Sequence, residues 1–181
     1  MELNSLTIRT LSLLGSCGAY GMAMKDLAKE NDNIIALTAD LCSFSGLTSY
    51  AQDFPNQFYN IGIAEQNMTG IAAGMAKEGL VPYVTSYAAF LSMRCADQIN
   101  VNCGYMNLPI KLVGLTSGLS VGILGPTHIC TDDIAIMRAI PNVVILSPAD
   151  CLETVKCVQA AAKINTPVYL RLTGTMGNPI V

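Results

Sequence analysis

Apolar residues recur along the chain with two different spacings that alternate. Short runs rich in β-branched residues, typical of buried strands, occupy residues 33–38, 81–87, 110–115, 143–146 and 168–172. Apolar positions at helical spacing occupy residues 18–30, 64–77, 90–105 and 150–163. This alternation predicts βαβ units, and therefore an α/β fold in which a parallel sheet is flanked by helices on both faces.

Ligands of parallel α/β sheets bind beyond the carboxyl ends of the strands. The segments that follow the predicted strands are therefore where chemistry is expected, at residues 40–46, 62–65, 87–90 and 116–128. No internal repeat, low-complexity tract or Pro/Gly/Ser-rich linker divides the chain. We expect residues 1–181 to form a single domain. The ending MGNPIV lacks an obvious terminal cap, as expected for a piece of a longer polypeptide.

The amino-acid composition bears on how the surface of the domain is used. Hydrophobic residues make up 51% of the chain and charged residues only 13%, whereas about a quarter of a typical soluble domain is charged. One explanation is a core whose strands are apolar on both faces. The other, which we favour, is an apolar surface that faces another subunit.

Charge and cysteine content exclude several functional classes. The net charge is −3, and the ten Lys and Arg residues are scattered, so the sequence shows no basic patch that would bind nucleic acid. The sequence has no apolar run of about 20 residues, as a membrane span requires, and MELNSLTIRT is not typical of a signal peptide. Seven cysteines without a CxxC pair, and one His, do not fit a zinc site. They are typical of reduced, mostly buried thiols in a cytoplasmic protein. A catalytic thiol would need a base, and only Cys130 has a neighbouring His, His128.

The most informative stretch is NIGIAEQNMTGIAAGMAKEGLVP, residues 60–82. Glu65 opens the predicted helix, and its neighbours are apolar. A carboxylate at a helix start has a simple structural explanation in the helix dipole. An apolar pocket, however, raises the pKa of a carboxylic acid, and the neutral acid can donate a hydrogen bond to a ring nitrogen.

A set of motifs extends from this stretch across nearly the whole chain: AYG near residue 20, then TSYAAFLSMRCADQI, GLSVG, GPTH, AIPNVVILSPAD and PVYLRL. Together they resemble the pyrimidine-binding domain of the transketolase family, including the forms encoded as two subunits. The resemblance implies a subunit of a thiamin-diphosphate-dependent enzyme that transfers a two-carbon ketol unit. In that family a Glu hydrogen-bonds the aminopyrimidine N1′, so that the cofactor removes its own C2 proton.

The resemblance assigns roles residue by residue. Glu65 matches the acid at N1′, and Ile63 in the same motif is expected to contact the cofactor. Phe90 would stack on the pyrimidine, with Tyr87 as its support. Asp40 matches an Asp near the thiazolium ring, whose positive charge it would favour. The structural alternatives are core packing for the aromatic pair and a turn or cap for Asp40.

His128, in GPTH, is the chain's only His and matches a family His that faces the reacting carbon and the substrate oxygen. There it would transfer a proton near neutral pH or hydrogen-bond a developing alkoxide. A lone His is often structural, but its position in a predicted loop favours a functional role.

Several positions that contact the sugar phosphate in the family carry different residues in this sequence. Cys17 stands where the family has an Arg, residues 115–118 (LTSG) lack the family His, and Leu124 replaces an acid. Gly174 occupies the place of an Arg after the last strand, although Arg171 is near. Because Arg recognises phosphate through charge-assisted, bidentate contacts, we expect an atypical sugar-phosphate site.

The element that holds Mg²⁺ and the diphosphate in the family, Gly-Asp-Gly followed by an Asn-rich segment, does not occur in the sequence. Asp132 and Asp133 are adjacent, so they suit a helix N-terminus better than a metal pair. The resemblance therefore implies a partner subunit that carries the diphosphate-binding domain and most of the Mg²⁺ contacts. We also expect self-association and a sugar or 2-oxo substrate.

Other interpretations remain open. A 2-oxo-acid dehydrogenase E1 β-like or deoxyxylulose-phosphate-synthase-like subunit would share Glu65 and the domain. The pairing of GLSVG with GPTH favours transketolase, and the altered phosphate positions weaken that preference. A non-catalytic α/β scaffolding subunit is the alternative of another class.

Overall fold

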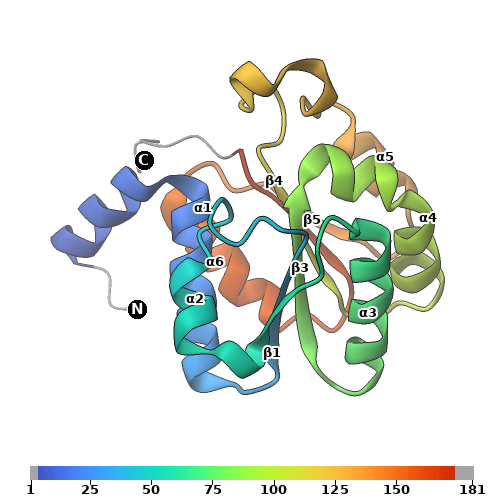
Figure 1. Cartoon of the computed structure of the whole chain (residues 1–181), viewed down its shortest axis with the longest axis horizontal. Coiled ribbons are helices and arrows are strands. Elements are labelled where there is room, and N and C mark those ends of the chain that lie inside the picture. Colours follow the sequence, from blue (N-terminus) through green and yellow to red (C-terminus); the bar gives the residue numbers. More distant parts are fainter. Residues whose placement is uncertain (1–3, 174–181) are drawn as a thin grey trace.

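Six parallel strands form a single sheet in the computed structural model, which describes residues 4–173 (Figure 1). The strands are β1 (Ile34–Thr38), β2 (Phe58–Asn60), β3 (Val81–Tyr87), β4 (Lys111–Leu115), β5 (Val144–Leu146) and β6 (Val168–Arg171). Their order across the sheet is β2-β1-β3-β4-β6-β5. The predicted parallel sheet is confirmed. The sequence pattern missed β2, a three-residue edge strand with two exposed positions.

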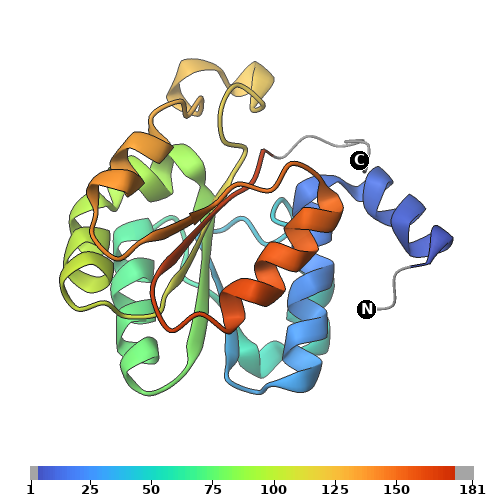
Figure 2. The same cartoon turned by 180° about the vertical axis from the view of Figure 1, so that it is seen from behind.

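Helices cover both faces of this sheet (Figures 1 and 2). One layer consists of α1 (Ser5–Glu30) and α6 (Cys151–Ala162), with α2 (Thr48–Asp53) beside α1; the other consists of α3 (Glu65–Lys77), α4 (Ala96–Ile99) and α5 (Asp133–Ala139). Short helical segments are η1 (Pro55–Gln57), η2 (Phe90–Arg94), η3 (Asn100–Tyr105) and η4 (Gly122–Thr127). No helix within residues 4–173 is long and apolar enough to cross a membrane.

Alternation of side chains along each strand builds two separate cores. Ile34 and Ala36 pack with α1 and α6, whereas Ile35 and Leu37 pack with α3 and α4. All five residues of β1 are buried, because both faces of the strand are covered. A core of this kind accounts for part of the apolar composition.

The first helix begins much earlier than the predicted residue 18. It starts at Ser5, where the Asn4 side chain accepts a hydrogen bond from the Thr7 amide at 2.9 Å. Gly15 interrupts it with φ of 72°, and the turns before Gly15 extend away from the body of the molecule (Figure 1). The apolar spacing identified only the part after the kink, because that part packs on the sheet.

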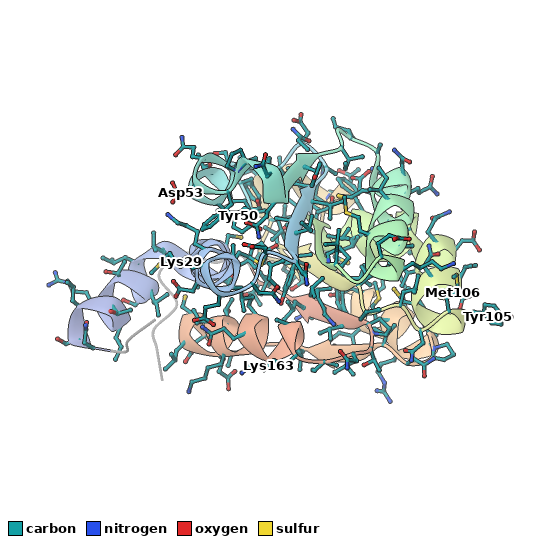
Figure 3. The ribbon with its side chains drawn as sticks, turned by 90° about the horizontal axis from the view of Figure 1, so that it is seen from below. Lys29, Tyr50, Asp53, Tyr105, Met106 and Lys163 are labelled. Atoms are coloured by element: carbon teal, nitrogen blue, oxygen red, sulfur yellow. The ribbon has the colours of Figure 1, made fainter. Side chains whose placement is uncertain are left out.

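The predicted helix 90–105 is helical but uneven. The wide π-type turns of η2 and η3 flank the single α-helical stretch α4. Such turns occur frequently at functional sites. At the far end of η3, Tyr105 is 89% exposed and projects from the molecule (Figure 3).

The seven cysteines are free, and four of them are buried. Burial raises the pKa of the Cys95 thiol to about 11 and that of Cys103 to about 12. Both thiols therefore stay protonated near neutral pH and act as small apolar side chains, as the sequence predicted.

Two helical glycines provide a test of this packing. A Cβ at Gly21 in α1 would overlap the carbonyl oxygen of Gly46, whereas one at Gly74 in α3 would meet nothing within 4 Å. Gly21→Ala should lower the free energy of unfolding by about 1–3 kcal/mol. Gly74→Ala should raise it by up to about 1 kcal/mol, because alanine is the better helix former. Urea unfolding followed by circular dichroism measures both, and equal midpoints would contradict the close α1 contact.

Candidate functional site

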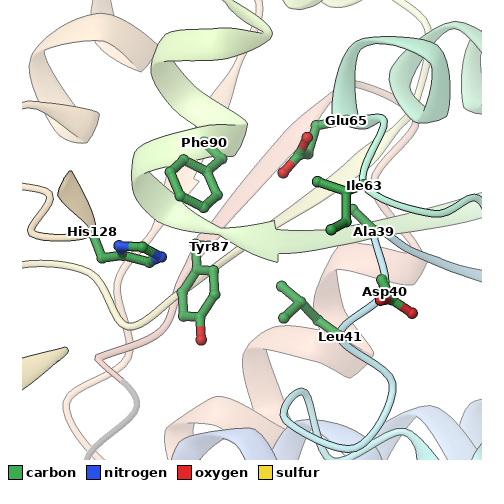
Figure 4. Close-up of a pocket in the computed structure, with 8 residues that line it drawn as sticks. All are labelled: Ala39, Asp40, Leu41, Ile63, Glu65, Tyr87, Phe90 and His128. Atoms are coloured by element: carbon green, nitrogen blue, oxygen red, sulfur yellow. The ribbon is translucent and has the colours of Figure 1, made fainter. Parts of the chain in front are cut away.

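A cavity of about 200 Å³ opens at the carboxyl ends of β1 and β3 (Figure 4). These strands are hydrogen-bonded neighbours, so the segments that follow them meet at one edge of the sheet. The cavity is lined by Ala39, Asp40, Leu41, Ile63, Glu65, Tyr87, Phe90 and His128. All six residues predicted from the sequence to form the site thus lie around one cavity. Their roles stay predictions.

Glu65 lies at the first position of α3 with its side chain only 3% exposed. Its Oε1 accepts a hydrogen bond from Ser86 Oγ at 3.3 Å, and its Oε2 accepts one from Arg94 Nη1 at 2.7 Å. The carboxylate therefore has polar partners that lie far away in the chain, in addition to the apolar neighbours seen in the sequence. A buried carboxylate is costly unless it is paired, and Arg94 supplies the cation.

Arg94 contacts a second wall of the cavity as well. Its guanidinium carbon lies 4.3 Å from the centroid of the Phe90 ring. The side chain of Arg94 is 43% exposed, so it reaches inward from the surface. Sequence reasoning did not single out Arg94. The available signal was its spacing of four residues from Phe90 in a helical segment, which brings two side chains onto one face.

The aromatic wall consists of three rings in edge-to-face contact. Tyr87 and Phe90 are 5.7 Å apart between centroids, and the His128 ring lies 5.2 Å from Tyr87 and 4.9 Å from Phe90. The Nδ1 atom of His128 is 2.9 Å from Thr127 Oγ1. Aromatic pairs in this geometry stabilise one another by about 0.5–1.5 kcal/mol beyond their burial, so the wall is held in a defined shape.

The long loop that carries His128 is closed at its base. Gly118 N donates to Cys130 O at 2.6 Å, and Cys130 N donates back to Gly118 O at 3.1 Å. These two bonds form an isolated antiparallel bridge that fixes both ends of the loop. His128 is therefore held in place by the loop base as well as by its ring contacts.

The thiol of Cys130 does not pair with His128. Its sulfur lies 3.6 Å from Ser92 Oγ and 3.5 Å from Asp132 Oδ1. Burial raises the pKa of this thiol, and the nearby carboxylates of Asp133 and Asp132 raise it further, which disfavours the thiolate. The geometry gives no support to a catalytic thiol.

Asp133 and Arg171 have a structural role that the sequence did not reveal. Asp133 is fully buried, and its Oδ2 accepts hydrogen bonds from Tyr169 OH and Arg171 Nε, both at 2.9 Å. The prediction that Asp132 and Asp133 lie at a helix N-terminus is confirmed, because Asp132 is the N-cap of α5 and Asp133 is in its first turn, although the Asp132 side chain makes no cap bond. Arg171 is consequently engaged by an acid and is not a free phosphate ligand. Gly174 lies outside the described residues.

Asn60, which was not among the predicted site residues, connects two walls of the cavity. Its Oδ1 accepts from the amides of Asp40 and Gly62, each at 3.0 Å, and its Nδ2 donates to Asp40 Oδ1 at 3.1 Å. These bonds hold Asp40 in a left-handed conformation with φ of 59°. An Asn two positions before a Gly is typical of a turn, and this signal was available in the sequence.

The arrangement suits a flat heterocycle. A buried carboxylate and an aromatic ring lie on facing sides of the opening (Figure 4), and the cavity lining includes no Lys or Arg. A planar ring can stack on Phe90 while one of its nitrogens meets Glu65. The charged groups of the lining, Asp40 and Glu65, disfavour an anion such as phosphate.

Removal of the Asn60 side chain should loosen both walls. In Asn60→Ala, the amides of Asp40 and Gly62 lose their acceptor, so their hydrogen exchange should accelerate by about tenfold, as loss of one hydrogen bond of ~1–1.5 kcal/mol implies. Asn56→Ala, a nearby exposed asparagine, is the control. Exchange measured by NMR should show no change at Leu37 in either variant; unchanged rates at Asp40 and Gly62 would contradict the role of Asn60.

Comparison with known proteins gives a consistent result. Residues 16–177, which include the whole cavity, match the family model described as transketolase, pyrimidine binding domain. The chain is 35% identical over 153 residues to the 6-deoxy-6-sulfo-D-fructose transketolase subunit SqwH of Clostridium sp. (strain MSTE9), covering 84% of this chain and 48% of that protein. It is 37% identical over 152 residues to a 1-deoxy-D-xylulose-5-phosphate synthase of Syntrophus aciditrophicus, covering 84% and 23%.

Among solved structures, one described as a split gene transketolase, inactive beta4 tetramer, matches with a TM-score of 0.77 and 36% identity. The match covers 87% of this chain and 50% of that one. The chain thus spans about half the length of the split transketolase relatives that it matches.

Proposed function

Because this chain belongs to the transketolase family, as a pyrimidine-binding domain, we propose that it supplies the pyrimidine half of the active site of a thiamin-diphosphate-dependent enzyme transferring a two-carbon ketol unit. One observation carries the proposal: the buried Glu65 carboxylate and the Phe90 ring line the same cavity at the carboxyl edge of the sheet.

The residues present fit the aminopyrimidine of the cofactor. When bound, thiamin diphosphate supplies a nucleophilic carbon that attacks a carbonyl. Glu65 holds a proton at the ring nitrogen N1′, and Phe90, supported by Tyr87, orients the ring. Asp40 favours the positive charge of the thiazolium ring. His128, at the same cavity, hydrogen-bonds the substrate oxygen and moves its proton.

The residues that line the cavity do not provide for the diphosphate. The cavity lining offers no cation, and the sequence has no Gly-Asp-Gly element for Mg²⁺. Large apolar side chains are exposed at the same end of the molecule, including Ile63 (78%), Leu119 (72%) and Ile123 in η4, which stands beyond the sheet (Figure 1). A partner that carries the diphosphate-binding domain and Mg²⁺ would cover them. The tetrameric relative supports additional self-association.

The donor substrate is expected to be atypical. Arg94, beside the cavity, and Arg171, three positions before Gly174 in the sequence, each bind an acid. Cys17 and Leu124 offer no charge where the family has charged residues. The relative named for 6-deoxy-6-sulfo-D-fructose is consistent with a family branch that uses unusual sugars.

A deoxyxylulose-phosphate-synthase-like reaction is the second candidate. The 37% identity to such a synthase favours it, and Glu65 and Phe90 would have the same tasks. The two candidates differ in the donor, which is a ketose for ketol transfer and a 2-oxo acid for the synthase-like reaction. Supplying each donor to the same complex separates them.

The proposed role of Glu65 can be tested in the assembled complex. The chain is mixed with the subunit of the same genome that carries the Gly-Asp-Gly element, and thiamin diphosphate binding is measured by calorimetry. Glu65→Gln should lower kcat by about 10²–10⁴-fold, the usual contribution of a positioned proton partner. Glu78→Gln, an exposed glutamate just beyond α3, is the matched control. A complex that binds no thiamin diphosphate, or a fully active Glu65→Gln complex, would refute the proposal.

The phosphate prediction is tested by comparing donors. With xylulose 5-phosphate and unphosphorylated xylulose, kcat/KM of the complex should differ by less than about tenfold, since a charge-assisted hydrogen bond of about 1.5–3 kcal/mol should be missing. If kcat/KM for xylulose 5-phosphate were several hundredfold higher than for xylulose, the site would recognise the phosphate group and the prediction would be wrong.

A further inference from the structure

Phe90 separates two cavities of this molecule. The first is the proposed cofactor cavity. The second, of about 370 Å³, has Phe90, Met93, Arg94, Thr127 and Asp132 among its lining residues. Arg94 lines only the second cavity, and Glu65 lines only the first. The guanidinium of Arg94 nevertheless reaches both Glu65 and Phe90.

The contact with Glu65 distinguishes the two carboxylate oxygens. Oε2 is held by Arg94 at 2.7 Å, a short charge-assisted bond. Oε1 has only the longer contact of 3.3 Å with Ser86 Oγ. Oε1 is therefore the oxygen that remains available to a ring nitrogen in the cavity.

The contact with Phe90 distinguishes the two faces of the ring. The guanidinium occupies one face, at 4.3 Å from the centroid. A second planar group can stack only on the opposite face. The edge contacts with Tyr87 and His128 restrict rotation of the ring.

The backbone of Arg94 is fixed to the helix that Glu65 begins. Gln66 Nε2 donates to the Arg94 carbonyl oxygen at 3.0 Å. Together with the ion pair, this bond ties η2 to the first turn of α3. Displacement of Arg94 would therefore disturb both groups that face the cavity.

We propose that Arg94 is a positioning residue that aligns the Glu65 carboxylate and the Phe90 ring for the cofactor's pyrimidine. The proposal rests on the proposed function of Glu65 and Phe90, and it assigns Arg94 no contact with the cofactor. The simpler alternative is that Arg94 only neutralises a buried acid. The two differ in what a neutral or a differently shaped side chain does to turnover.

Four variants of the assembled complex distinguish these roles. Arg94→Met removes charge and hydrogen bond, Arg94→Gln keeps a hydrogen-bond donor without charge, and Arg94→Lys keeps the charge without the planar face. Arg138→Met, an exposed arginine in α5, is the matched control. Rates are divided by the amount of bound thiamin diphosphate, so that loss of folded complex does not count as loss of kcat.

Arg94→Met should lower kcat by about tenfold or more, since misplacement of reacting groups by about 1 Å is enough for such a loss. Thiamin diphosphate affinity should fall by about fivefold, roughly one aromatic contact, while KM for the donor stays within about twofold of wild type. Arg94→Lys should restore most of kcat and less of the cofactor affinity, because lysine holds the carboxylate but not the ring face.

Wild-type kcat and cofactor affinity in Arg94→Met, with Glu65→Gln inactive, would overturn the positioning role alone. Should Arg94→Met fail to assemble, Arg94→Gln and Arg94→Lys decide: wild-type activity in Arg94→Gln, or full recovery of both kcat and cofactor affinity in Arg94→Lys, overturns the proposal, and recovery of kcat without cofactor affinity in Arg94→Lys supports it. A wild-type complex that binds no thiamin diphosphate would remove the proposed function and this inference together.

Discussion

The ion pair between Glu65 and Arg94 is the constraint on which the rest of the site depends. A carboxylate that is 3% exposed cannot stand alone, because an unpaired buried charge costs several kcal/mol. The segment after β3 must therefore bring a cation to the start of α3. Once it does, Phe90 is held between that cation and the cavity, and the aromatic wall is complete.

The parallel arrangement of the strands explains how the other side chains of the site come to lie around one cavity. The ends of β1 and β3 are adjacent, so Asp40 and Tyr87 face one cavity although a whole βαβ unit separates them in sequence. Hydrogen bonds then lock the loops in place. Asn60 joins the loop after β1 to the loop before α3, and the Gly118–Cys130 bridge closes the loop that bears His128.

The same geometry describes an incomplete site. The cavity has a place for a planar ring and no cation for a diphosphate, and apolar side chains surround its mouth. The split transketolase relatives that the chain matches are about twice as long as the chain itself. Arg94 and Arg171 are each engaged by an acid of the same chain, so neither is a free cation near the cavity.

The sequence pattern was sufficient to predict the parallel α/β sheet, because strand and helix periodicities alternate along the chain. The bounds predicted for β3, Val81–Tyr87, match those of the structure. The resemblance of its motifs to the family also identified six of the eight residues that line the cavity, because such motifs can be recognised locally in the sequence. Only the tertiary structure decided what those residues touch. The partners of Glu65, Asp40 and Asp133 lie 20 or more positions away in the chain, at Arg94, Asn60 and Arg171. Pairings over such separations depend on how strands are ordered in the sheet, which no local pattern of apolar and polar residues encodes.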